Sequence, residues 1–155
     1  MMKKMLLTAV LLALVLSLAG CGQPKEEAPA VKLPLDELAA SVAADAGTLL
    51  QFSAEDLEDA LGITPEMYTE FIYLQDDAMT GREILALRTG SPDAAEQVRV
   101  KLEAYLERQR KETRDYLPEA YKLLAAAKVE VKNNTVALIA GENAAEETRK
   151  LLAGE

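Results

Sequence analysis

Residues 82–106, REILALRTGSPDAAEQVRVKLEAYL, carry the two patterns that decide the fold. The apolar run over residues 84–87 suits a β-strand. After it, Ser91 predicts a helix N-cap and Pro92 suits the first helical position. An apolar stripe then recurs at helical spacing, through Ala95, Val98, Leu102, Tyr105 and Leu106. A strand followed directly by a long amphipathic helix indicates a domain that mixes both kinds of element.

Two hairpins are predicted around this stretch. Residues 67–75 are rich in aromatic and branched side chains, and the short connection over residues 76–81 predicts that they pair with residues 82–89. Further on, residues 129–132 alternate between apolar and charged side chains, and Asn133 and Asn134 tolerate left-handed backbone in a turn. Residues 136–140 are continuously apolar, which predicts a central strand covered by other elements.

Helices are predicted over residues 35–46 and 54–61, from Pro118 onward, and from Asn143 to near Gly154. Ser53 with Asp56 resembles a capping box, and Asn143 with Glu146 repeats that spacing. The expected fold class is α+β: a single two-layer domain with a four-stranded, mainly antiparallel sheet of two hairpins and helices packed on one face.

The first 21 residues have the layout of a secretory signal. Lys3 and Lys4 precede an apolar run over residues 5–19, and small residues lead to Cys21. A 15-residue helix rises only about 22 Å, short of the roughly 30 Å hydrocarbon core of a bilayer. We therefore expect a cleaved leader and no permanent transmembrane span.

Residues 18–21, LAGC, resemble a bacterial lipobox. The resemblance implies that a diacylglycerol is attached to the sulfur of Cys21 and that the chain is cleaved before it. We expect a signal peptide over residues 1–20, a lipidated cysteine with a Pro-rich linker over residues 21–34, and a single domain over residues 35–155. The domain would then lie at the outer face of the cytoplasmic membrane, held by its lipid anchor.

Composition narrows the chemistry that the chain can perform. It has no His, no Trp and one Cys, which excludes imidazole catalysis, His-ligated metals and intrachain disulfides. Ser41, Ser53 and Ser91 therefore have no histidine partner. The sequence contains no Gly-rich phosphate or dinucleotide motif and no calcium-loop pattern. We expect a noncatalytic domain that uses no cofactor and no metal.

Charge is distributed unevenly along a chain with a net charge of −9. Residues 33–81 contain 11 acidic residues and no Lys or Arg. Nucleic acid is excluded as a partner, because phosphate binding requires clustered positive charge. The acidic stretch is either a binding surface or simply the solvated face of helices. An envelope protein or a cell-wall component is the expected partner, and the oligomeric state stays open.

Tyr116, Glu119 and Tyr121 are the candidate binding residues, since they flank the break at Pro118. Aromatic rings beside a helix start can line a ligand groove, or they can cap the core with the hydroxyl in water. An alternative function is therefore a small-solute-binding or hydrolase-like domain that uses a pocket near Tyr116 and Tyr121.

Two short motifs resemble a known family. Residues 61–65, LGITP, and residues 116–121, YLPEAY, are similar to the domain-of-unknown-function family 4358. The similarity covers roughly residues 35–152 in the order and type of elements. It implies a lipid-anchored or secreted single-domain protein of Gram-positive bacteria, with no assigned activity, substrate or cofactor.

Overall fold

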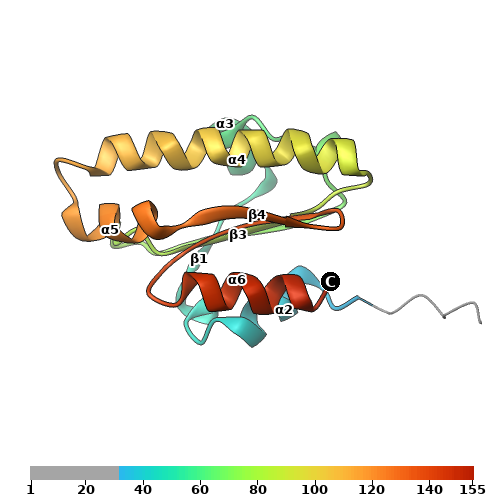
Figure 1. Cartoon of the computed structure of the whole chain (residues 1–155), viewed down its shortest axis with the longest axis horizontal. Helices are drawn as coiled ribbons and strands as arrows, with labels where there is room; N and C mark the ends of the chain where they lie inside the picture. Colours follow the sequence, from blue (N-terminus) through green and yellow to red (C-terminus); the bar gives the residue numbers. More distant parts are fainter. Residues whose placement is uncertain (1–31) are drawn as a thin grey trace, which may run out of the picture. The chain divides into compact units, whose positions relative to one another are not determined.

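The computed structural model describes residues 32–155 (Figure 1). The predicted signal peptide, Cys21 and nearly all of the linker lie outside the described residues, so lipidation stays a prediction. Within residues 32–155, no helix combines the length and apolarity needed to cross a membrane.

The centre of the domain is a five-stranded antiparallel sheet in the order β1-β2-β3-β5-β4. Its strands are β1 (Leu50–Gln51), β2 (Glu70–Gln75), β3 (Glu83–Arg88), β4 (Lys128–Lys132) and β5 (Thr135–Ala140). Both predicted hairpins are present, and the pairing of β3 with β5 joins them. Strand β5 lies between two neighbours and is buried along its whole length, which confirms that the return strand is central.

The prediction of four strands was one strand short. The fifth strand, β1, has only two residues, which pair as Leu50 with Gln75 and Gln51 with Leu74. Both β1 residues are exposed. A segment of this length gives no alternation to recognise in sequence, and it is a strand only because β2 offers an edge to pair with.

Helices cover both faces of the sheet, so the domain has three layers and the prediction of a single helical face was wrong (Figure 1). On one face, α3 (Ala54–Leu61), α4 (Pro92–Thr113) and α5 (Pro118–Ala126) pack against Leu85, Leu87 and Leu138. On the other face, α2 (Leu35–Val42) and α6 (Ala144–Ala153) pack against Ile84 and Ile139. The reason is that β3 and β5 carry apolar side chains on both faces, and each face must be covered.

Helix ends follow the predicted capping chemistry in two of three cases. The Ser53 hydroxyl accepts the Asp56 amide at 3.2 Å, and the Asp56 carboxylate accepts the Ser53 amide at 2.8 Å. Ser91 likewise accepts the amide of Ala94 at 3.2 Å. Asn143 precedes α6 but makes no side-chain cap hydrogen bond, so this capping box was wrong. The Glu146 carboxylate that would complete it is paired with Lys150 at 2.7 Å.

The end of β3 is tied to both ends of the described chain. Arg88 donates from Nε to Glu155 at 2.9 Å and pairs with Glu70. Glu70 in turn accepts the backbone amide of Leu35 at 2.6 Å, at the start of α2. The Glu155 side chain is fully buried by these contacts. The sheet therefore fixes where α2 begins and where the chain after α6 lies.

Candidate functional site

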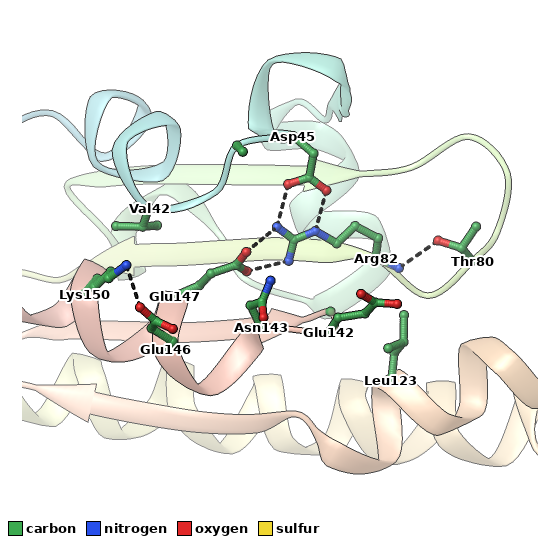
Figure 2. A pocket seen from close by; sticks show the side chains of 12 residues that line it. Val42, Asp45, Thr80, Arg82, Leu123, Glu142, Asn143, Glu146, Glu147 and Lys150 are labelled. Atoms are coloured by element: carbon green, nitrogen blue, oxygen red, sulfur yellow. Dashed lines mark hydrogen bonds and ion pairs between the residues drawn. The ribbon is translucent and has the colours of Figure 1, made fainter.

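Arg82 lies just before β3 and links two separate segments (Figure 2). Its Nε donates to Asp45 Oδ2 at 2.8 Å and its Nη2 donates to Asp45 Oδ1 at 2.7 Å. From the other side, Nη1 donates to Glu147 Oε2 at 2.7 Å and to the Ala140 carbonyl at 3.1 Å, and Nη2 reaches Glu147 Oε1 at 3.1 Å. An arginine has five N–H donors. All five are used here within the protein.

We call Arg82 with its two carboxylate partners, Asp45 and Glu147, the Arg82 clamp. A wide pocket of about 600 Å³ surrounds this clamp. Its charged groups are largely paired with one another, since Lys150 binds Glu146 and Arg82 binds Asp45 and Glu147. Hydrogen bonding to Arg82 lowers the pKa of Asp45, although burial opposes this. The pairs connect the loop after α2 with α6, and we interpret the clamp as structural.

A second, smaller pocket of about 180 Å³ lies on the opposite face of the sheet. Successive strand residues point to opposite faces, so Glu83 points toward α4 and α5 where Arg82 points toward α6. Glu83 lines this pocket and is only 2% exposed. Among residues 32–155, its Oε1 is the buried side-chain atom that lacks a hydrogen-bond partner. The pocket has room for about six water molecules at ~30 Å³ each.

Two polar residues of the Glu83 pocket lining, Gln75 and Gln109, are held by the hydroxyl of Tyr105 on α4, which lies behind the lining. This oxygen accepts the side-chain amide of Gln75 at 2.8 Å and that of Gln109 at 2.9 Å, and lies 3.3 Å from the hydroxyl of Tyr73. With both lone pairs used, the Tyr105 hydroxyl is left to donate its proton to the Tyr73 oxygen. The network fixes one side of the pocket through β2 and α4.

Burial controls the protonation of this site. It raises the pKa of Glu83 to about 8, although the nearby Tyr105 hydroxyl and Gln75 amide oppose the rise. Burial and the proximity of Glu83 raise the pKa of Tyr73 to about 12, and the same causes raise the pKa of Tyr105. At neutral pH Glu83 is therefore mostly a neutral carboxylic acid, which can donate one hydrogen bond and accept others.

The apolar part of the pocket wall comes from the start and body of α5 and from the β2–β3 loop (residues 76–82). Leu117, which immediately precedes α5, and Ala120 and Leu124 of α5 supply one side, and Met79 supplies an exposed rim. Gly81 has φ +85°, and a Cβ there would lie 2.9 Å from the backbone of Ala120. The loop therefore rests directly on α5 and closes one side of the pocket, which requires glycine at this position.

The predicted binding residues lie near this pocket but do not line it. Tyr116 is 85% exposed, Glu119 is exposed and Tyr121 is half-buried. None of the three lines either pocket described above, whereas their neighbours Leu117 and Ala120 line the Glu83 pocket. A binding role for Tyr116, Glu119 and Tyr121 stays a prediction.

Sequence reasoning did not identify the polar residues of the pocket. The available signals were an acidic residue joined directly to the apolar run over residues 84–87, and Tyr105 and Gln109 one helical turn apart. What brings them together is the register of β2 and β3, which places Gln75 opposite Glu83. That register follows from tertiary pairing, and neither signal is distinctive without it.

Comparison with known proteins gives one match. The model of the family described as a domain of unknown function, DUF4358, matches residues 42–141. No curated protein and no solved structure matches the chain. Within the described part of the chain, no group of three or more acidic, cysteine or histidine side chains is arranged to hold a metal ion.

Proposed function

We propose that this chain, which belongs to the DUF4358 family of unknown function, is a noncatalytic, lipid-anchored binding protein that takes a small solute into the Glu83 pocket. The observation that carries this proposal is Glu83, a carboxyl group only 2% exposed that lines a pocket and whose Oε1 has no hydrogen-bond partner. A buried polar atom without a partner costs about 1–3 kcal/mol. A ligand that bonds to this oxygen recovers that free energy.

The contrast with the larger pocket supports this choice. There, the carboxylates of Asp45 and Glu147 already bind Arg82, so a ligand would have to break strong pairs to bind. In the Glu83 pocket, a ligand can bond to a carboxyl group that is in no ion pair and whose Oε1 has no hydrogen-bond partner, and it also covers apolar surface on α5. Small-molecule sites typically combine apolar walls with a few placed polar groups in this way.

Binding, and not catalysis, is what the lining groups support. Asp76 also lines the pocket, but its carboxylate accepts the backbone amide of Thr80 at 3.0 Å. Arg82 is saturated on the other face of the sheet. Glu83 is thus left as a single acid without a paired nucleophile or base, whereas catalysis of group transfer needs such a pair.

The proposed location at the outer face of the cytoplasmic membrane is supported by the signal layout and the LAGC sequence ending at Cys21. The alternative partner, an envelope protein or a cell-wall component, is supported by surface charge alone. We propose the solute-binding function because the Glu83 pocket adds a specific chemical feature.

The lipid anchor is tested by replacing Cys21 with Ala. We expect the protein to move from the membrane fraction to the soluble or unprocessed fraction, because the sulfur that would carry the lipid is gone. Fractionation and mass spectrometry of the mature protein measure this. Normal processing and membrane retention of the Cys21→Ala variant would contradict lipidation.

Solute binding is tested by screening small polar fragments against the purified protein by NMR. Fragments that bind should shift the NMR signals of Glu83, Gln109 and Leu117. A Leu117→Trp variant should no longer bind these fragments, because the indole fills the pocket. Tyr116→Trp is the matched control, since the adjacent Tyr116 is exposed and lies outside the pocket lining. Fragments that bind equally to both variants, or a complete lack of binders, would refute the proposal.

A further inference from the structure

We infer that the ligand of the Glu83 pocket is a small organic ammonium ion, with its nitrogen paired to the Glu83 carboxylate and its hydrocarbon part lying against α5. This inference rests on the proposed function and adds the chemical class of the ligand. Three features of the pocket lead to it: its available charge, its hydrogen-bonding groups and its apolar wall.

Once Glu83 has lost its proton, the charge that the pocket offers to a ligand is negative. The ionisable groups lining the pocket are Asp76, Arg82 and Glu83. Every N–H of the Arg82 guanidinium is bonded to Asp45, Glu147 or the Ala140 carbonyl on the other face, so this side chain offers no donor to an anionic ligand. An anionic ligand would lie beside the carboxyl groups of Glu83 and Asp76, and no cationic side chain of the lining is free to donate to it. A cationic ligand would instead pair with a group of opposite charge.

Several hydrogen-bond acceptors line the pocket, beside the second amide hydrogen that Gln75 and Gln109 each retain. Gln75 and Gln109 each donate an amide hydrogen to Tyr105, and their carbonyl oxygens accept none of the hydrogen bonds found in residues 32–155. Thr113 donates its hydroxyl hydrogen to the Gln109 backbone carbonyl at 2.7 Å, which leaves its oxygen as an acceptor. With Glu83 Oε1, these oxygens suit the three N–H donors of a primary ammonium group.

The apolar wall and the volume limit the rest of the ligand. Leu117, at the N-cap of α5, and Ala120 and Leu124 of α5 line the pocket, with Met79 at the rim. This surface suits an unbranched alkyl or small aryl group and gains hydrophobic free energy as it is covered. A volume of about 180 Å³ restricts the ligand to a few heavy atoms, well below the roughly 300–1,000 Å³ pockets of drug-sized ligands.

Binding of an ammonium ion is coupled to proton release by Glu83. Tyr73 on β2 and Tyr105 on α4 stay protonated near neutral pH, since their pKa values are raised. Arg82 stays charged, Asp76 accepts the Thr80 amide, and the residues that line the pocket from α5 and its N-cap carry no charge. Glu83, with a pKa of about 8, therefore loses its proton when it pairs with the cation. Below pH 8, affinity should rise about tenfold for each pH unit.

The test uses NMR titrations of the whole chain, purified in detergent, with three probes of equal chain length: n-butylammonium, n-butanol and n-butyrate. We expect n-butylammonium to bind most tightly and to gain about tenfold in affinity between pH 6 and pH 7. The Glu83→Gln variant should bind n-butylammonium at least about tenfold more weakly than the wild type, and its affinity should not change with pH. Glu130→Gln is the control, because Glu130 is an exposed residue of β4.

The outcomes separate the ligand class from the proposed function. If n-butanol or n-butyrate binds in a Leu117-dependent manner and n-butylammonium does not, the ammonium assignment is overturned and the solute pocket stands. If n-butylammonium binds equally well to wild type and Glu83→Gln, the ammonium assignment is also overturned. If none of the three probes binds and the fragment screen finds none, both the assignment and the proposed function fall.

Discussion

Replacing Glu83 with Gln should stabilise the domain, and the gain should grow with pH. In the unfolded chain this carboxyl titrates near 4.5, whereas burial in the fold raises its pKa to about 8. Between these values the folded state holds a proton that the unfolded state has lost. The contribution of Glu83 to wild-type stability therefore falls as pH rises from about 4.5 to about 8, and it stays lower above that range.

The size of the effect follows from the two pKa values. At 1.36 kcal/mol for each tenfold change in proton affinity, the rise from 4.5 to about 8 corresponds to about 5 kcal/mol. Gln has nearly the same shape and does not titrate. We expect Glu83→Gln to match the wild type within about 1 kcal/mol at pH 4.5, to exceed it by about 3 kcal/mol at pH 7, and to exceed it by about 5 kcal/mol at pH 9.

Urea unfolding followed by circular dichroism at these three pH values measures the difference. Effects of the other titrating groups cancel, because they are common to both proteins and the substitution is local. Glu130→Gln, on exposed β4, should show no comparable pH-dependent gain. A Glu83→Gln difference that is constant with pH, or a variant less stable than wild type at pH 9, would refute the burial of an ionisable Glu83.

Three further predictions concern stability. Arg82→Lys should lower the free energy of unfolding, measured in urea, by about 3 kcal/mol, because one ammonium group cannot bridge the two carboxylates that the guanidinium holds. A loss below about 1 kcal/mol would show that these ion pairs are dispensable for stability. Gly81→Ala should cost about 1–3 kcal/mol through its left-handed backbone and contact with α5, while Gly90→Ala, with nothing within 4 Å, should cost less; equal losses would contradict the close contact. Burial favours a higher pKa for Glu155, but its bonds to Arg88, Lys32 and Thr135 prevail and hold the pKa at about 2. Its contribution is therefore present above about pH 4.5 and lost as pH falls through 2. Glu155→Gln should thus show a shallower acid loss of stability, and an unchanged acid transition would argue against these bonds.

Local sequence signals predicted much of the fold. The Ser53–Asp56 box, the Ser91 cap and the left-handed Asn133, with φ 54°, are decided within a few residues, and the structure has all three. The two hairpins were also predictable, because short turns are flanked by segments that are either continuously apolar or alternate between apolar and charged residues. Asn143 shows the limit of such signals: its capping partner Glu146 pairs instead with Lys150, one turn further along α6.

The sequence by itself determined the type and order of most elements, since hydrophobic periodicity and helix caps act over a few residues. Only the tertiary structure decided that helices cover both faces of the sheet, that β1 joins it, and that Glu83 is buried beside Gln75 and Tyr105. The physical reason is that burial and strand register depend on residues far apart in the chain. The proton affinity of a carboxyl depends on the surroundings that these distant residues create.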